Sequence, residues 1–225
     1  MADKAPGGPQ ATDHFSLGAN FAVQTSNNND TKDVYRAFNG DGDEGCVTTF
    51  NNRNEYTASY VHCGSDLDTD LGTLLTAFGG QHNSIQVTDV SISFSADSHA
   101  TIDVTGHQHD SNAHSSDIGQ ANLVSVIPDG FGGVGVPAFW SNADANSTPV
   151  SATLNLTLEH FDQIGADGEH FAGANTRIRA ELSVTYAGAP TLTTTGWTVS
   201  EEDLAESNEE FDTTAITADK YFDQA

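Results

Sequence analysis

The chain has 225 residues, enough for one large β domain or two small ones, and its 7 Lys and Arg face 32 Asp and Glu, for a formal net charge of −25. Binding to nucleic acid depends on cationic contacts to phosphate, so this charge argues against direct contact with DNA or RNA. No apolar run is long enough for a transmembrane helix, and the first residues contain no signal-peptide h-region. We therefore expect a protein that is made and kept in the cytoplasm, or that leaves the cell by lysis or particle release.

The acidic residues are spread along the whole chain between Thr, Ser, Asn and Gly, and lysine occurs only at Lys4, Lys32 and Lys220. In dilute buffer so much like charge repels itself and loosens the compact state. At about 1 M salt the Debye length falls to about 3 Å and the repulsion is largely screened. Alternating apolar segments argue against disorder. The composition therefore predicts a folded, halophilic protein.

The first third of the chain is expected to be β-structure divided by polar turns. The expected elements are a flexible N-terminal arm (1–14), a β segment (15–24), a polar loop (27–33), a short strand (34–38), a tight turn (39–45) and a hairpin (46–63) that turns at 51–54. Five apolar residues at helical spacing then indicate a short helix over residues 66–78.

The two cysteines, Cys46 and Cys63, flank the expected hairpin. On facing strands they would be a disulfide candidate. Two buried free thiols and a bridge between subunits are the alternatives, and the sequence leaves all three open.

Period-2 alternation in the rest of the chain is typical of strands with one buried and one wet face. Such strands are expected at 85–94, 102–104, 150–158 and 178–186, with a phase change at Asp89 that indicates a bulge. Short strands separated by Gly- and Asn-rich turns predict an all-β fold, a jelly-roll or β-sandwich barrel. We assign this barrel to residues 15–199, with inserted loops or a raised second, smaller β domain stacked on it.

The last segment differs in composition. Ser200 is expected to cap a short helix over residues 201–208, because acids in a first helical turn are favoured by the helix dipole. Residues 200–225 are rich in acids and are expected to form an acidic C-terminal arm that orders against a neighbour, with a disordered tail as the alternative. A glycine-rich loop is expected over residues 128–137.

The densest candidate for chemistry is the run from Gly106 to His114. On a strand, His107 and His109 would share one face, and His114 could return from the following loop, so that three imidazoles would hold a metal ion. The alternative is a set of ordinary solvated loop residues. A second group could supply a carboxylate: Glu159, His160, Asp167, Glu169 and His170.

The sequence contains no complete calcium-binding loop and no recognised catalytic or phosphate-binding motif. Asp41, Asp43 and Glu44 lack the full spacing of a calcium loop, so a solvated turn is the favoured interpretation. The chain contains neither a Gly-x-Ser-x-Gly elbow nor a phosphate-binding Gly-x-x-x-x-Gly-Lys loop. We expect no catalytic residues, no certain cofactor and no enzymatic activity.

The features converge on one family. Three stretches carry a resemblance: the run Gly106 to His114, the segment Val134-Gly135-Val136-Pro137, and Glu159-His160-Phe161 with the segment Gly165 to Phe171 that leads into the strand 177–186. Together they resemble the larger type of major capsid protein of haloarchaeal icosahedral viruses with internal membranes. The resemblance covers residues 85 to 200. It implies a vertical single β-barrel in a viral shell, self-association into capsomers, a second, smaller capsid protein as partner, and proximity to an internal viral membrane. It carries over no catalytic motif.

The function expected is therefore that of a structural capsid protein in the virion, assembled in the host cytoplasm. Two rivals remain open from the residues. The first is a secreted or surface haloarchaeal β-sandwich binding module, which would be a monomer in solution. The second is a metal-dependent enzyme using His107, His109 and His114, which would hold a stoichiometric transition metal.

Overall fold

The computed structural model describes residues 12–64, 70, 78, 81–82, 84–95, 97–109, 148–166, 170–188, 197–205 and 212–223. The prediction of an all-β fold is confirmed. The strands are β1 (Phe21–Phe38), β2 (Glu44–His62), β3 (Gln81–His82), β4 (Ile85–Ser95), β5 (Ser98–His109), β6 (Thr148–Ile164), β7 (His170–Ala187), β8 (Thr198–Ala205) and β9 (Thr213–Asp223). Within the described ranges, no helix is long and apolar enough to cross a bilayer.

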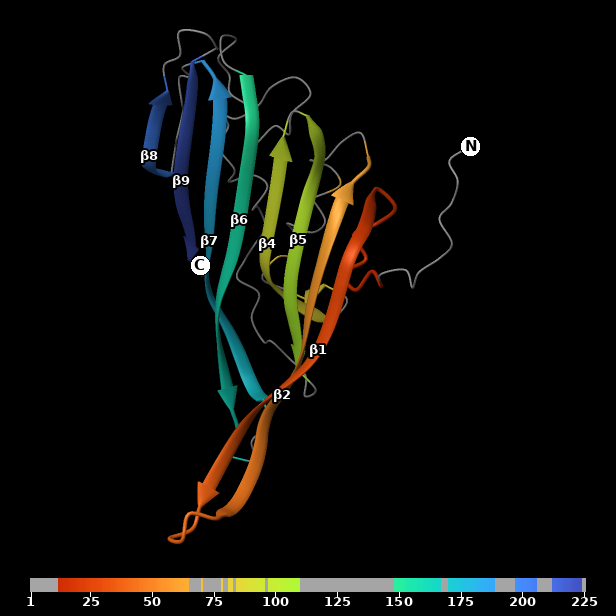
Figure 1. Cartoon of the computed structure of the whole chain (residues 1–225), viewed down its shortest axis with the longest axis vertical. Coiled ribbons are helices and arrows are strands. Elements are labelled where there is room, and N and C mark those ends of the chain that lie inside the picture. The colour runs from red at the N-terminus through yellow and green to blue at the C-terminus, as the bar shows by residue number, and fades with distance from the viewer. Residues whose placement is uncertain are drawn as a thin grey trace.

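The strands form one antiparallel sheet in the order β1-β2-β5-β4-β6-β7-β9-β8, with the short β3 beside β4 (Figure 1). Strands that follow each other in sequence pair as β1–β2, β4–β5, β6–β7 and β8–β9, so the sheet is a row of hairpins. A twisted antiparallel sheet of this width tends to curl or fold over, which is consistent with the predicted barrel or sandwich.

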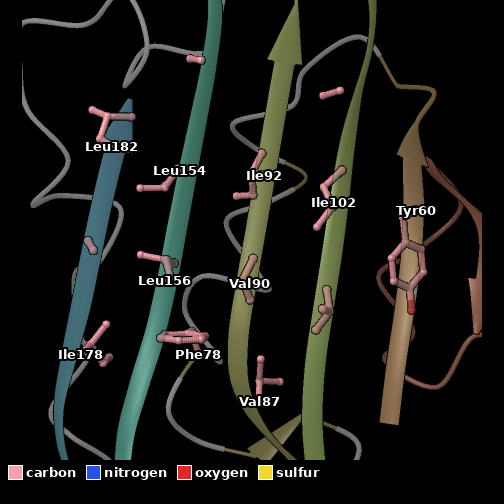
Figure 2. Close-up of a cluster of buried hydrophobic side chains, with 14 of the residues drawn as sticks. Tyr60, Phe78, Val87, Val90, Ile92, Ile102, Leu154, Leu156, Ile178 and Leu182 are labelled. Carbon is pink, nitrogen blue, oxygen red and sulfur yellow. The ribbon is translucent and has the colours of Figure 1, made fainter. Parts of the chain in front are cut away.

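One face of the sheet carries the core. A row of cross-strand neighbours runs through six strands, and each of its members is 2% exposed or less: Tyr60, Ile102, Ile92, Leu154, Leu182 and Ala218. Figure 2 shows the first five of them. Phe15, Phe78 and Trp197, which lie outside the strands, belong to the same buried cluster. Burying a side chain of this size contributes about 1.5–3 kcal/mol, so the row explains why the period-2 strands hold together.

Three local predictions are confirmed. The period-2 segments at 85–94, 102–104, 150–158 and 178–186 lie within β4, β5, β6 and β7. The register of β4 against β5 shifts between Val87 and Asp89, where the alternation changes phase. The glycine-rich segment 39–45 closes the β1–β2 hairpin, with Gly42 at φ 86° and the Asn39 side chain accepting hydrogen bonds from the amides of Asp41 and Asp43. A positive φ is the conformation for which glycine has no steric penalty.

Two predictions in the first third of the chain are wrong. The polar residues 27–33 are not a loop, because β1 runs unbroken from Phe21 to Phe38. The segment from Cys46 to Cys63 is not a hairpin, because residues 44–62 form the single strand β2. Pairing between the two strands satisfies the backbone of the Asn-rich segment, and this tertiary term outweighs its low strand propensity.

The predicted helix over 201–208 and the acidic C-terminal arm are also wrong as far as the structure describes them. Residues 198–205 form β8, and residues 213–223 form β9, which lies between β7 and β8 inside the sheet. β9 joins the sheet because its buried side chains extend the apolar face of β7 by one strand. These side chains are Thr214, Ile216 and Ala218.

Several predictions fall on residues outside the described ranges: most of the N-terminal arm (1–11), most of the helix over 66–78, and the glycine-rich loop over 128–137. Asp13 and His14, at the end of the expected N-terminal arm, contact β2: the Asp13 carboxylate lies 2.7 Å from the Tyr60 hydroxyl, and the His14 ring lies 5.0 Å from that of Tyr56.

The β1–β2 hairpin extends past the rest of the sheet and forms the lowest part of the view in Figure 1. β5 pairs with β2 only from Arg53 to Val61. Beyond Arg53, residues 32–52 form a ribbon of two strands that pair with each other alone among the described residues. We call residues 32–52 the arm.

Candidate functional site

The histidines singled out in the sequence lie at the end of β5. His107 and His109 are both buried, and their ring centroids are 5.0 Å apart. His160 of β6 joins them, with its ring 4.9 Å from that of His107. The strand therefore brings His107 and His109 onto one face, and a third imidazole comes from the β6–β7 hairpin.

Gly106 lets the neighbouring strand approach this cluster. A Cβ atom at position 106 would lie 2.5 Å from the carbonyl oxygen of Gln86 and 2.8 Å from Cγ2 of Ile85. The backbone of β4 therefore passes β5 too closely for any side chain at this position. His107 follows directly and points to the opposite face, where it lies in register with Gln86 of β4 and Glu55 of β2.

The β2 side of the cluster is charged. Glu55 lies opposite His107 and Arg53 lies opposite His109. Their side chains form an ion pair with 3.0 Å between Arg53 Nη2 and Glu55 Oε1. The histidines are thus packed beside a compensated pair rather than beside a single unpaired charge.

The predicted metal site stays a prediction. His114, Asp167 and Glu169 lie outside the described residues, as does the side chain of His170. Glu159 is placed elsewhere, with its carboxylate 2.7 Å from Nε of Arg177. Among the residues that the structure describes, no group of three or more His, Cys, Asp or Glu side chains is arranged to hold a metal ion.

A second imidazole contact lies where β2 ends. Nε2 of His62 is 2.7 Å from Oδ2 of Asp70, and the amide of Asn20 donates to the same carboxylate at 2.9 and 3.0 Å. The hydrogen bond from His62, followed by those from Asn20, holds the pKa of Asp70 below its ordinary value. This network joins the segment after β2 to the turn before β1.

The two cysteines do not pair within one chain. Both are free and exposed, Cys46 near the start of β2 and Cys63 just past its end. A strand of this length separates them by roughly 55 Å at about 3.3 Å per residue. A disulfide needs Cα atoms within about 7 Å of each other, so only the bridge between subunits remains open from the sequence alternatives.

The arm exposes apolar side chains on both faces. Val34 and Val47 lie on one face, with Tyr35 on the other, and their exposed fractions are 46%, 45% and 59%. Phe38, next to the turn, is 63% exposed. Phe161, on the part of β6 that runs past its pairing with β4, is exposed to the same extent. Four of these residues lie on the arm, and several large apolar side chains exposed on one short ribbon are typical of an interaction surface.

The opposite edge of the sheet is acidic. β8 is exposed along all 8 of its residues, three of which are the consecutive acids Glu201, Glu202 and Asp203. Among the described strands, β8 pairs only with β9 and β1 pairs only with β2, so both edges of the sheet keep an unpaired row of backbone groups.

No protein-family model matches this chain, and no curated protein matches its sequence.

The spacing in the sequence predicts that His107 and His109 share a face, but it assigns His160 to a separate group. The contact of His160 with His107 joins β6 to β5 across the intervening β4, and no residue spacing encodes this strand order. The arm was not predicted from the sequence. Apolar residues occur at both odd and even positions of 34–38 and 46–50. A strand with one buried face can accommodate only one of these two sets, so this pattern could have indicated the arm.

Proposed function

We propose that this chain is a structural subunit of a viral shell, a major capsid protein of a halophilic archaeal virus that acts without catalysing a reaction. The observation that carries the proposal is the arm, a two-stranded ribbon that leaves the sheet and exposes Val34, Tyr35, Phe38 and Val47. A two-stranded ribbon is at best marginally stable alone in water. Contact with a neighbouring subunit would bury these side chains and support the ribbon.

The composition supports the same function. A formal net charge of −25 suits a particle that must stay soluble in brine, where the charges are screened. The acidic edge at β8 suits a subunit that must not grow by pairing with identical edges, because charged side chains block such pairing.

Further elements of the proposal come from the family resemblance. They are a vertical β-barrel arrangement of the subunit, capsomers of several copies, a smaller capsid protein as partner, an internal membrane nearby, and assembly in the host cytoplasm.

The test is the mass of the native species by multi-angle light scattering, over a range of protein concentrations in about 3 M salt, where surface repulsion is screened. We expect a defined oligomer or particles. A strict monomer at every concentration would count against a shell subunit and would favour a haloarchaeal β-sandwich binding module.

A further inference from the structure

The two edges of the sheet differ in charge. Between Asp30 and Phe38 the edge strand β1 carries two acids and the bases Lys32 and Arg36, so this stretch is neutral in a chain of net charge −25. β8 carries three acids and no base in 8 residues. The cations of one edge therefore match the anions of the other.

The same comparison disfavours pairing between like edges. Two β8 strands side by side would bring two runs of Glu201, Glu202 and Asp203 together, and like charges on neighbouring strands are destabilising. β8 facing β1 brings its acids instead to a neutral stretch, on which Lys32 and Arg36 offset Asp30 and Asp33. Arg36 already forms an ion pair with Glu44, which lies across the hairpin and leaves the Arg36 side chain 55% exposed.

Both edges also expose apolar side chains that could pack against each other. Val199 and Leu204 at the two ends of β8 are 38% and 56% exposed. On the arm, the exposed Val34, Tyr35 and Phe38 lie among the charged residues of β1. An added strand binds through its backbone hydrogen bonds and obtains specificity from alternate side chains, so both kinds of contact are available to this pair of edges.

The two edges lie at opposite ends of the strand order, and in Figure 1 β8 is near the top of the view whereas the arm forms its lowest part. Within one chain the arm runs away from β8. A contact between them therefore joins two copies of the chain.

We propose that the arm of one subunit adds as an extra strand to the β8 edge of a second copy of this chain. The contact is heterologous, so each copy has one arm to give and one β8 edge to receive, and repetition produces a ring or a continuing chain of subunits. This inference rests on the proposed shell function and names the surface and the partner that it uses.

The experiment uses two variants, each lacking one half of the contact. In the arm-less variant, residues 32–52 are replaced by Asn-Gly, which joins Thr31 to its register partner Arg53 through the two-residue turn that hairpins favour. In the edge-reversed variant, Glu201→Lys, Glu202→Lys and Asp203→Lys reverse the charge of β8. The altered β8 side chains are exposed, so we expect its fold to persist, and circular dichroism checks this for both variants.

Each variant is measured alone and in an equimolar mixture by light scattering, at the lowest salt concentration that keeps both folded, because salt screens exposed charges. We expect the wild-type chain to associate and each variant alone to remain monomeric. The mixture should form a heterodimer that grows no further, since it contains one intact arm and one intact edge. Val150→Lys, at a position 41% exposed and away from both edges, is the control and should associate like the wild type.

The outcomes separate the two proposals. If the wild type associates but the edge-reversed variant alone does so equally well, the arm binds another surface and this inference fails while the shell function stands. Equal association by the arm-less variant, or a mixture that stays monomeric, also overturns it. A wild type that is monomeric at every concentration removes the shell function, and this inference with it.

Discussion

The imidazole of His62 and the carboxylate of Asp70 lie 2.7 Å apart between Nε2 and Oδ2, and Gly64 leaves the room for this contact. A Cβ at position 64 would lie 2.6 Å from the same Asp70 oxygen and 2.8 Å from Nε2 of His62. The pair is also held by the amide of Asn20, so the turn before β1 and the segment around the end of β2 meet at one carboxylate.

The Asp70 network predicts a pH-dependent contribution to stability. The pKa of Asp70 is lowered in the folded state, so its contribution is present above the unfolded-state pKa of about 4 and is lost as the pH falls below that value. We expect Asp70→Asn to lower the thermal midpoint at pH 7, and the gap from the wild type to shrink as the pH approaches 3. Thermal unfolding followed by circular dichroism from pH 3 to 7 measures this.

Asp103→Asn is the control for this prediction, because Asp103 on β5 is an exposed carboxylate. It should leave the midpoint nearly unchanged at both ends of the pH range. A gap between Asp70→Asn and the wild type that is as large at pH 3 as at pH 7 would contradict the proposed role of the charge.

Gly106 is predicted to be intolerant of even the smallest side chain. The atoms that a Cβ would meet are the Gln86 carbonyl oxygen at 2.5 Å and Ile85 Cγ2 at 2.8 Å, and the first belongs to the backbone. Gly106→Ala must therefore separate β4 from β5, at a cost of about 1–3 kcal/mol. Urea unfolding measures the loss. Gly40→Ala, at an open position of the β1–β2 turn, is the matched control, and an equal effect at both positions would show that crowding is not the cause.

The sequence was informative where one buried face imposed a period. The alternation in β4, β6 and β7 predicted strands, and the phase change at Asp89 predicted the bulge, because each apolar residue had to reach the same core. It was misleading for residues 27–33 and 201–205, where nearly all side chains are exposed and cross-strand pairing alone defines the strand. Local propensity carries no information about a distant partner strand.

The same distinction applies to the candidate surfaces: features set by spacing within one strand could be predicted from the sequence, and features set by the pairing of distant strands could not. That His107 and His109 share a face follows from spacing alone, whereas the approach of His160 depends on the strand order, which brings β6 next to β4 and within reach of β5. The arm could have been inferred only by treating 44–62 as one strand. The cluster of Asn and Arg at 51–54 indicated a turn there instead, although Arg53 and Asn54 pair with both β1 and β5.

Tyr60 is predicted to secure the segment before β1. Its buried hydroxyl donates to Oδ1 of Asp13 at 2.7 Å, and that oxygen also accepts from the amide of Ser16. Removing a hydrogen bond to a charged group costs about 1.5–3 kcal/mol, so Tyr60→Phe should lower the free energy of unfolding by this amount. Urea unfolding in high salt measures it. Tyr35→Phe, at a hydroxyl on the exposed arm, should change little; an equal loss at both would rule out the Asp13 contact as the cause.

The buried row across the sheet predicts large and unequal losses on truncation. Ile92 is fully buried at its centre, between Ile102 and Leu154. Ile92→Ala leaves a cavity that the neighbouring strands cannot fill, with an expected cost of about 2–5 kcal/mol. Val199→Ala, on the exposed β8, should cost far less. The comparison uses urea midpoints at one salt concentration. Similar values for the two variants would mean that the row is not the core.

Stability should rise steeply with salt. A net charge of −25 acts against the compact state, and the Debye length falls from about 10 Å at 0.1 M to about 3 Å at 1 M. We expect the thermal midpoint to climb over this range of potassium chloride and then to level off, because screening saturates once the Debye length is shorter than the spacing of the charges. Glu201→Gln, Glu202→Gln and Asp203→Asn together remove three of the charges without altering a buried residue, and should shift the rise to lower salt.

A midpoint that is the same at 0.1 and 1 M would contradict the halophilic interpretation of the composition. A rise that continues without levelling would assign the effect to exclusion of salt from the surface rather than to screening.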